Sequence, residues 1–166
     1  MSSTPPSERV GALKILVIED TDRKWNDIRD ALGFIGAKEV RRAATIEDAE
    51  NLIELNWDLV VLDISMDIRA SKAGPKEGGH DPTGGLKVAA KMYYLGCEAP
   101  TIILTAFDAF PSRLRGAQIG NVILGLEEVE RRAREQLGAA FVGCVKWDSP
   151  DWRSEFQNYV FGVAGQ

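Results

Sequence analysis

Residues 58–66 read DLVVLDISM, and this stretch decides the fold. Its apolar letters LVVL, at 59–62, form an uninterrupted β-branched and leucine run, which is typical of a strand buried on both faces of a parallel sheet. Asp63 follows at once, so a carboxylate stands where this strand ends. Similar short runs are expected to form strands at 13–18, 39–43, 101–105 and 140–145.

Segments with apolar residues at helical spacing separate these runs. Helices are expected to begin near Asp22, Thr45, Gly84 and Ser149–Pro150, and the longest is expected over Ile119–Leu137. Thr45, with Asp48 three residues later, has the spacing of a capping box. The alternation of strands and helices predicts an α/β fold with an open, doubly wound parallel sheet.

Length and composition limit the possible functions. The 166 residues favour one domain. The net charge of −5 disfavours a protein that coats nucleic acid, and two cysteines, Cys97 and Cys144, make neither a disulfide framework nor a zinc site. No apolar run reaches membrane-spanning length and the N-terminus lacks a signal-peptide pattern. We therefore expect a cytoplasmic protein with a flexible tail at 1–11 and a single domain at 12–166.

Two segments interrupt the alternation. Residues 66–83 lack apolar periodicity and are interpreted as a loop insertion, either a lid over a site or a disordered loop. His80, the only histidine, lies in this insertion and either approaches the site or is an exposed polar residue. An extended region spans 106–138, and its Ile119–Leu137 stripe either faces the core or forms a partner or dimer surface.

Polar side chains stand at the ends of four expected strands. Glu19–Asp20 follow the first strand, Asp63 follows the third, Thr105 ends the fourth and Lys146 follows the fifth. Parallel strands place these ends at one edge of the sheet, where such sheets bind ligands. Crowded carboxylates favour a divalent cation, and their oxygens suit Mg²⁺. A carboxylate whose charge is offset by such a cation can attack an activated phosphoryl group. The phosphoryl oxygens then need hydrogen-bond donors or cations beside them.

In this constellation the sequence resembles the receiver domains of two-component response regulators, over roughly Lys14 to Val163. The motifs that carry the resemblance are the acidic pair Glu19–Asp20, Asp63 in LVVLDISM, Thr105–Ala106 in IILTA and Lys146 in CVKW. The resemblance implies a flavodoxin-like sheet of five parallel strands in the order 2-1-3-4-5, with helices on both faces. It also implies a cofactor, Mg²⁺, and a phosphorylated aspartate.

The resemblance assigns a role to each motif residue. Asp63 would accept the phosphoryl group, Thr105 would be the switch hydroxyl and Lys146 would pair with the phosphate. The Mg²⁺ ligands would be Glu19, Asp20, Asp63 and the backbone carbonyl of Ser65.

The sequence also departs from the family pattern. Asp67 and Trp147 stand where the family usually has proline. Gly143 stands where the family has its switch aromatic, and Phe141 lies two residues earlier. The resemblance therefore does not supply the aromatic partner of Thr105.

The resemblance implies a phosphorylation-controlled signalling domain rather than an enzyme. The partners would be a histidine kinase or histidine phosphotransfer protein and a downstream protein target, with neither nucleic acid nor membrane, and a homodimer could form through the Ile119–Leu137 region. One alternative is a receiver-like interaction module that is not phosphorylated. Another is a phosphohydrolase of the haloacid-dehalogenase type, but that family wants a second aspartate where this chain has Ser65.

Overall fold

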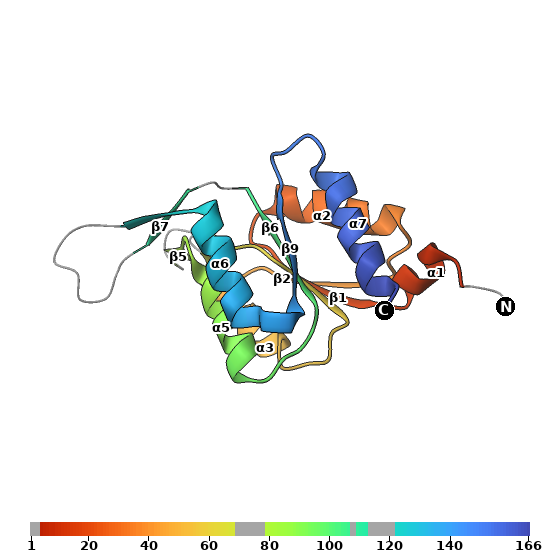
Figure 1. The fold of residues 1–166 in the computed structure, drawn as a ribbon, viewed down its shortest axis with the longest axis horizontal. Helices are drawn as coiled ribbons and strands as arrows, with labels where there is room; N and C mark the ends of the chain where they lie inside the picture. The colour runs from red at the N-terminus through yellow and green to blue at the C-terminus, as the bar shows by residue number, and fades with distance from the viewer. Residues whose placement is uncertain (1–3, 69–78, 107–108, 113–121) are drawn as a thin grey trace.

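The computed structural model describes residues 4–68, 79–106, 109–112 and 122–166. Its centre is a sheet of five parallel strands in the order β2-β1-β3-β6-β9 (Figure 1). The strands are β1 (Lys14–Ile18), β2 (Glu39–Ala43), β3 (Leu59–Leu62), β6 (Thr101–Thr105) and β9 (Phe141–Lys146). The predicted flavodoxin-like sheet with the order 2-1-3-4-5 is confirmed when these five strands are counted in chain order.

Helices cover both faces of this sheet, as Figure 1 shows. One face carries α3 (Ile46–Leu52), α5 (Gly84–Tyr94) and α6 (Leu126–Leu137), which is followed by the short 3₁₀ turn η1 (Gly138–Ala140). The opposite face carries α2 (Asp22–Phe34) and α7 (Trp152–Ala164). The apolar side chains of β1 and β3 alternate between two buried clusters, one under each helical layer. Burial on both faces explains the continuous apolar run of β3.

The predicted cap at Thr45 is confirmed. Its hydroxyl oxygen accepts a hydrogen bond of 3.0 Å from the backbone N–H of Asp48, at the start of α3. Such a cap typically contributes about 1 kcal/mol, because it satisfies one backbone donor that the first helical turn leaves without a partner.

The expectation of a flexible tail over 1–11 is wrong for its second half. Pro6–Gly11 forms the helix α1, with a proline in its first turn. Val10 is fully buried and belongs to the same apolar cluster as the inward face of α7. Tertiary packing of one valine therefore orders a segment whose own sequence carries almost no helical pattern.

The long helix expected over Ile119–Leu137 is wrong in its first part. The structure starts α6 at Leu126, and Val122–Gly125 forms β8, which pairs antiparallel with β7 (Ala109–Ser112). The run VIL has strand-forming residues, and its spacing matched the helical stripe by coincidence. Val129, Ala133 and Leu137 of the expected stripe are buried in the core, whereas Ile119 lies outside the described residues.

Two other expected boundaries shift by one to three residues. The fifth strand ends at Lys146 rather than before it, and the last helix begins at Trp152, with Asp151 at its cap position, rather than at Ser149–Pro150. The pairing of β6 with β9 contains a bulge beside Val142. A bulge adds one residue to a strand and reorients the side chains around it.

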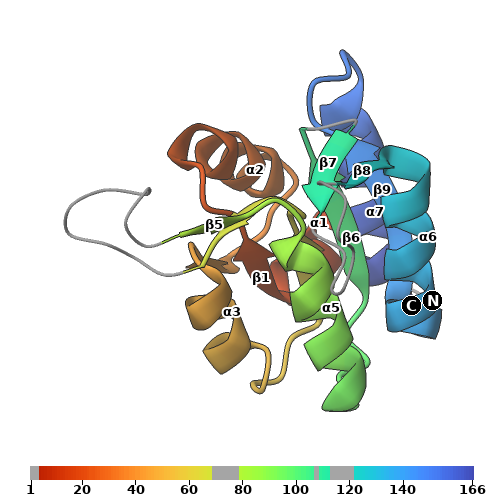
Figure 2. The same cartoon turned by 90° about the vertical axis from the view of Figure 1, so that its left-hand side faces the viewer.

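The insertion expected over 66–83 contains a second small hairpin. Met66–Asp67 (β4) pairs with His80–Asp81 (β5). The Ile68 carbonyl accepts a hydrogen bond of 3.0 Å from the Glu47 N–H, which attaches this hairpin to the start of α3. Both hairpins follow the carboxyl ends of sheet strands, as can be traced in Figure 2. Whether the insertion forms a lid depends mainly on 69–78, which lie outside the described residues.

Candidate functional site

Three carboxylates meet at the carboxyl edge of the sheet. One carboxylate oxygen each from Glu19, Asp20 and Asp63 lies within 4.8 Å of the others. The backbone brings them together, because Ile18 pairs with Leu62 and the Asp63 N–H donates to the Ile18 carbonyl at 3.0 Å. These three residues were expected to converge from their positions at the strand ends, and the structure places them together.

Two of these carboxylates are almost fully buried, which changes their acidity. Burial raises the pKa of Glu19 to about 7, and the nearby Asp63 carboxylate adds to this effect. Burial also raises the pKa of Asp63, while the Lys24 ammonium acts in the opposite direction. The cluster therefore holds negative charge only against a desolvation cost, so a neighbouring cation is favoured.

Lys24 of α2, which the sequence pattern did not single out, supplies such a cation. Its Nζ lies 2.8 Å from Glu19 Oε2 and 3.1 Å from Asp63 Oδ1, and it donates to the Leu104 carbonyl at 2.6 Å. The residue is only 3% exposed. One signal was available, because Lys24 lies four residues before Ile28 and thus on the buried stripe of the helix.

The Asp63 side chain is fixed by two donors on the same oxygen. Oδ1 accepts a hydrogen bond of 2.7 Å from the Ile64 N–H and also contacts Lys24. Helix α5 packs tightly against this turn, and the Gly85 N–H donates to the Ile64 carbonyl at 2.8 Å. A Cβ at Gly85 would lie 2.1 Å from the Asp63 carbonyl oxygen, so only glycine permits this approach.

Arg42, from β2, fixes the backbone beside the acidic pair. Its Nε donates to the Glu19 carbonyl at 2.8 Å and one terminal nitrogen donates to the Asp20 carbonyl at 2.9 Å. The other terminal nitrogen binds Asp22 at 2.7 Å. The sequence pattern did not single out Arg42 either, because a charged residue on an edge strand usually faces solvent.

Thr105 and Lys146 stand side by side at the ends of β6 and β9, where they pair in register. The Thr105 hydroxyl is fully buried and has no hydrogen-bond partner among the described residues. Lys146 is partly exposed, and its Nζ lies 3.7 Å from Asp148 Oδ1. A buried hydroxyl without a partner is costly, so this corner of the sheet is suited to an added acceptor.

Ser65 and His80 connect the small hairpin to the acidic cluster. The Ser65 hydroxyl and His80 Nε2 are 2.7 Å apart, and His80 Nδ1 lies 3.7 Å from Asp20 Oδ2. Of the two interpretations of His80, the structure favours the one in which it approaches the site. It does so from β5, although the ring remains 45% exposed.

No protein-family model matches the sequence, and no curated protein matches it. Solved structures do resemble the chain. The receiver domain of the Francisella response regulator 1452 is 16% identical with a TM-score of 0.60, over 92% of this chain and 97% of that one. The response regulator TrrA of Thermotoga maritima, solved in complex with Mg²⁺-BeF, is 22% identical with a TM-score of 0.56, over 91% and 98%. The BeF₃-activated receiver domain of DrrB is 17% identical with a TM-score of 0.60, over 93% and 98%.

The chain has the fold of a response-regulator receiver domain. Within this receiver fold, the packing of α7 against β9 explains why position 143 is a glycine. A Cβ at Gly143 would lie 2.4 Å from Cζ of Tyr159, a residue of α7. An aromatic ring from the helix thus occupies the space that a side chain at position 143 would need.

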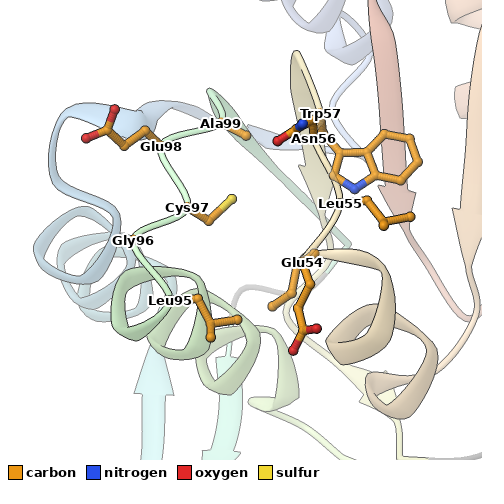
Figure 3. Close-up of a pocket in the computed structure, with 10 residues that line it drawn as sticks. Glu54, Leu55, Asn56, Trp57, Leu95, Gly96, Cys97, Glu98 and Ala99 are labelled. Atoms are coloured by element: carbon orange, nitrogen blue, oxygen red, sulfur yellow. The ribbon is translucent and has the colours of Figure 1, made fainter.

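The receiver fold has a hollow away from the acidic cluster. It measures about 370 Å³ and lies between the segments 53–57 and 95–99 (Figure 3). These segments precede β3 and β6, whereas Asp63 and Thr105 follow or end the same strands. The hollow therefore lies at the opposite edge of the sheet.

Among the described helices, none has the length and apolar character needed to cross a membrane.

Proposed function

We propose that this receiver domain accepts a phosphoryl group on Asp63, with Mg²⁺, in two-component signalling. The observation that carries the proposal is the convergence of Glu19, Asp20 and Asp63 at the carboxyl edge of the sheet. The partners would be a histidine kinase or a histidine phosphotransfer protein as donor, and a protein target that reads the phosphorylated state.

The reaction would transfer one phosphoryl group between two nucleophiles. A carboxylate oxygen of Asp63 attacks phosphorus, the new O–P bond forms and the N–P bond of the donor phosphohistidine breaks, so the imidazole leaves with the electron pair. Asp63 Oδ1 is engaged by Lys24 and the Ile64 N–H, so we assign the attack to Oδ2. The Thr105 hydroxyl and the Lys146 ammonium would bind the transferred phosphoryl oxygens.

The residues present fit a magnesium ion by their chemistry, because three carboxylates converge. Glu19, Asp20, Asp63 and the backbone carbonyl of Ser65 would hold it, and the ion would neutralise charge that develops on the phosphoryl oxygens. The Thr105 hydroxyl, which is buried and has no partner among the described residues, supports a phosphoryl group beside this magnesium site. The Mg²⁺-BeF complex of the Thermotoga maritima neighbour also supports this proposal.

A direct test incubates the protein with acetyl phosphate and MgCl₂ and then measures its intact mass. We expect the mass of one phosphoryl group to be added to the wild type and not to Asp63→Asn. A wild type without mass gain, or a gain that survives in Asp63→Asn, would overturn the proposal.

The second candidate function is a receiver-like interaction module that is not phosphorylated. Two observations favour it, namely the Lys24 ammonium within the acidic cluster and the absence of an aromatic side chain at Gly143. The mass measurement separates the two functions, since the module would gain no phosphoryl group in any variant.

A further inference from the structure

The buried ammonium of Lys24 is the least expected group in the site. Three oxygens surround its Nζ within 3.1 Å, from Glu19, Asp63 and the Leu104 backbone carbonyl. The side chains of Lys24, Glu19 and Asp63 are 4%, 1% and 6% exposed. The contact with the Leu104 carbonyl is a hydrogen bond, and the contacts with Glu19 Oε2 and Asp63 Oδ1 are ion pairs.

We propose that Lys24 is a built-in counterion of the acidic cluster, which holds Glu19 and Asp63 together without a divalent cation and competes with one for their oxygens. The inference rests on the magnesium site of the proposed function and adds a residue that controls access to it.

The competition follows from the positions of the charges. A magnesium ion needs its ligand oxygens at about 2.0–2.1 Å in near-octahedral geometry. The ammonium already contacts Glu19 Oε2 and Asp63 Oδ1, so a cation that uses these two oxygens must displace it. The positive charge of the ammonium offsets negative charge of the cluster, which weakens the attraction of the cluster for any added cation.

The anchoring of Lys24 explains why the ammonium remains there. The lysine lies in the first turns of α2, on the same buried face as Ile28 and Leu32. That face packs in the core beneath the sheet, so the helix presents the lysine stem to the cluster. The Leu104 carbonyl comes from β6 and not from the acidic cluster, so Lys24 also connects β1 and β3 to the next strand.

The test measures Mg²⁺ binding without any phosphodonor, by isothermal titration calorimetry of the wild type, Lys24→Met and a control variant. The control is Lys14→Met, which removes the same charge from an exposed lysine at the start of β1. We expect Lys24→Met to bind Mg²⁺ at least about tenfold more tightly than the wild type, because a unit charge next to the cation is removed. Lys14→Met should bind as the wild type does. Equal or weaker binding by Lys24→Met would overturn the inference.

A second variant and a second readout cover the case in which Lys24→Met does not fold. Lys24→Gln removes the charge but keeps a side-chain donor for the Leu104 carbonyl. Its thermal unfolding in EDTA and in MgCl₂ should show a larger stabilisation by Mg²⁺ than the wild type shows. An equal Mg²⁺-dependent shift for both proteins would contradict the inference.

A third arm uses the wild type alone. The ¹⁵N-labelled lysine ammonium signal of Lys24 should be visible in EDTA, because a buried, paired ammonium exchanges slowly with water. Saturating Mg²⁺ should shift or remove this signal, whereas an unchanged signal would count against displacement. None of these readouts needs phosphorylation, so a failure of the proposed transfer to Asp63 leaves them interpretable.

Discussion

The two halves of the site differ in how their polar groups are satisfied. On the β1–β3 side, Glu19 and Asp63 are buried and paired with Lys24, and the Ile64 N–H completes the contacts of Asp63. On the β6–β9 side, the Thr105 hydroxyl is buried and has no hydrogen-bond partner among the described residues, and Lys146 is partly exposed to solvent. The acidic half, on the β1–β3 side, already contains a cation for its carboxylates, and the donor half, on the β6–β9 side, is suited to an added anion.

This difference indicates that the two halves have different roles, one in holding a cation and the other in binding the phosphoryl group. Lys24 already balances the carboxylates of the acidic half, so an added divalent cation, rather than the phosphoryl group, should change the contacts there. The donor half would gain most of the new contacts when a phosphoryl group arrives, so population shift would act mainly on β6 and β9. The following experiments probe the contrast, from the largest expected effect to the smallest.

The pH dependence of stability should report the acidic half. The unfolded Glu19 has its ordinary pKa of 4.5, whereas burial raises the folded pKa to about 7. Between these values the folded state binds more protons than the unfolded state, so the free energy of unfolding should fall as pH rises, by about 3 kcal/mol over the whole range. Burial also raises the pKa of Asp63, which acts in the same direction. Urea denaturation in EDTA from pH 4.5 to 8 measures this fall.

Two variants show whether Glu19 causes the fall of the free energy of unfolding with pH. Glu19→Gln should make the fall with pH clearly smaller, and Glu98→Gln, an exposed carboxylate near the opposite edge of the sheet, should leave it unchanged. A wild type whose stability rises from pH 4.5 to 7 would show that the Lys24 pairing outweighs the desolvation of the two carboxylates.

The close approach of α5 should be the next most sensitive feature. Gly85→Ala places a Cβ 2.1 Å from the Asp63 carbonyl oxygen, so the helix must move away from the site. We expect a loss of about 1–3 kcal/mol in the free energy of unfolding, together with lower phosphoryl uptake. Gly162→Ala is the matched control, because a Cβ there meets nothing within 4 Å and alanine favours a helix. Equal effects of the two substitutions on stability would contradict the packing argument.

Removal of the Thr105 hydroxyl, in the donor half, should change the free energy of unfolding by a smaller amount and in the opposite direction. Thr105→Val removes a buried hydroxyl that has no partner in the described part of the chain, so stability should stay level or rise by up to about 1 kcal/mol, while phosphoryl uptake should fall. Thr101→Val, at the other end of β6, removes a hydroxyl that donates to the Ala99 carbonyl at 2.9 Å and should destabilise by about 1 kcal/mol. A similar loss of stability in both variants would mean that the Thr105 hydroxyl is bonded after all.

Lys146→Met should change stability least, within about 0.5 kcal/mol, because the side chain is partly exposed. The mass gain with acetyl phosphate should nevertheless become slower. Lys91→Met, which removes a charge from the C-terminal half of α5, should have a normal mass gain. If both lysine variants slow the reaction equally, the effect comes from net charge rather than from the position of Lys146.

The sequence predicted the strand framework and the acidic cluster for a simple reason. A polar residue directly after a run such as LVVL marks a strand end, and parallel strands collect their ends at one edge. Lys24 and Arg42 could not be found in this way, because their roles depend on which helix or edge strand packs beside the cluster. The hairpin strand Val122–Gly125 was missed because its apolar spacing also fits a helix, and only its partner Ala109–Ser112 decides between the two.

The contact between Gly143 and Tyr159 makes these two positions mutually dependent in any redesign of the domain. A larger residue at 143 would strike the tyrosine ring, and a smaller residue at 159 alone would leave a gap against β9. Only the joint exchange of a small residue at 159 and a large one at 143 would keep the volume. An aromatic side chain can thus be moved from the helix to the strand, but two separate substitutions must be introduced together.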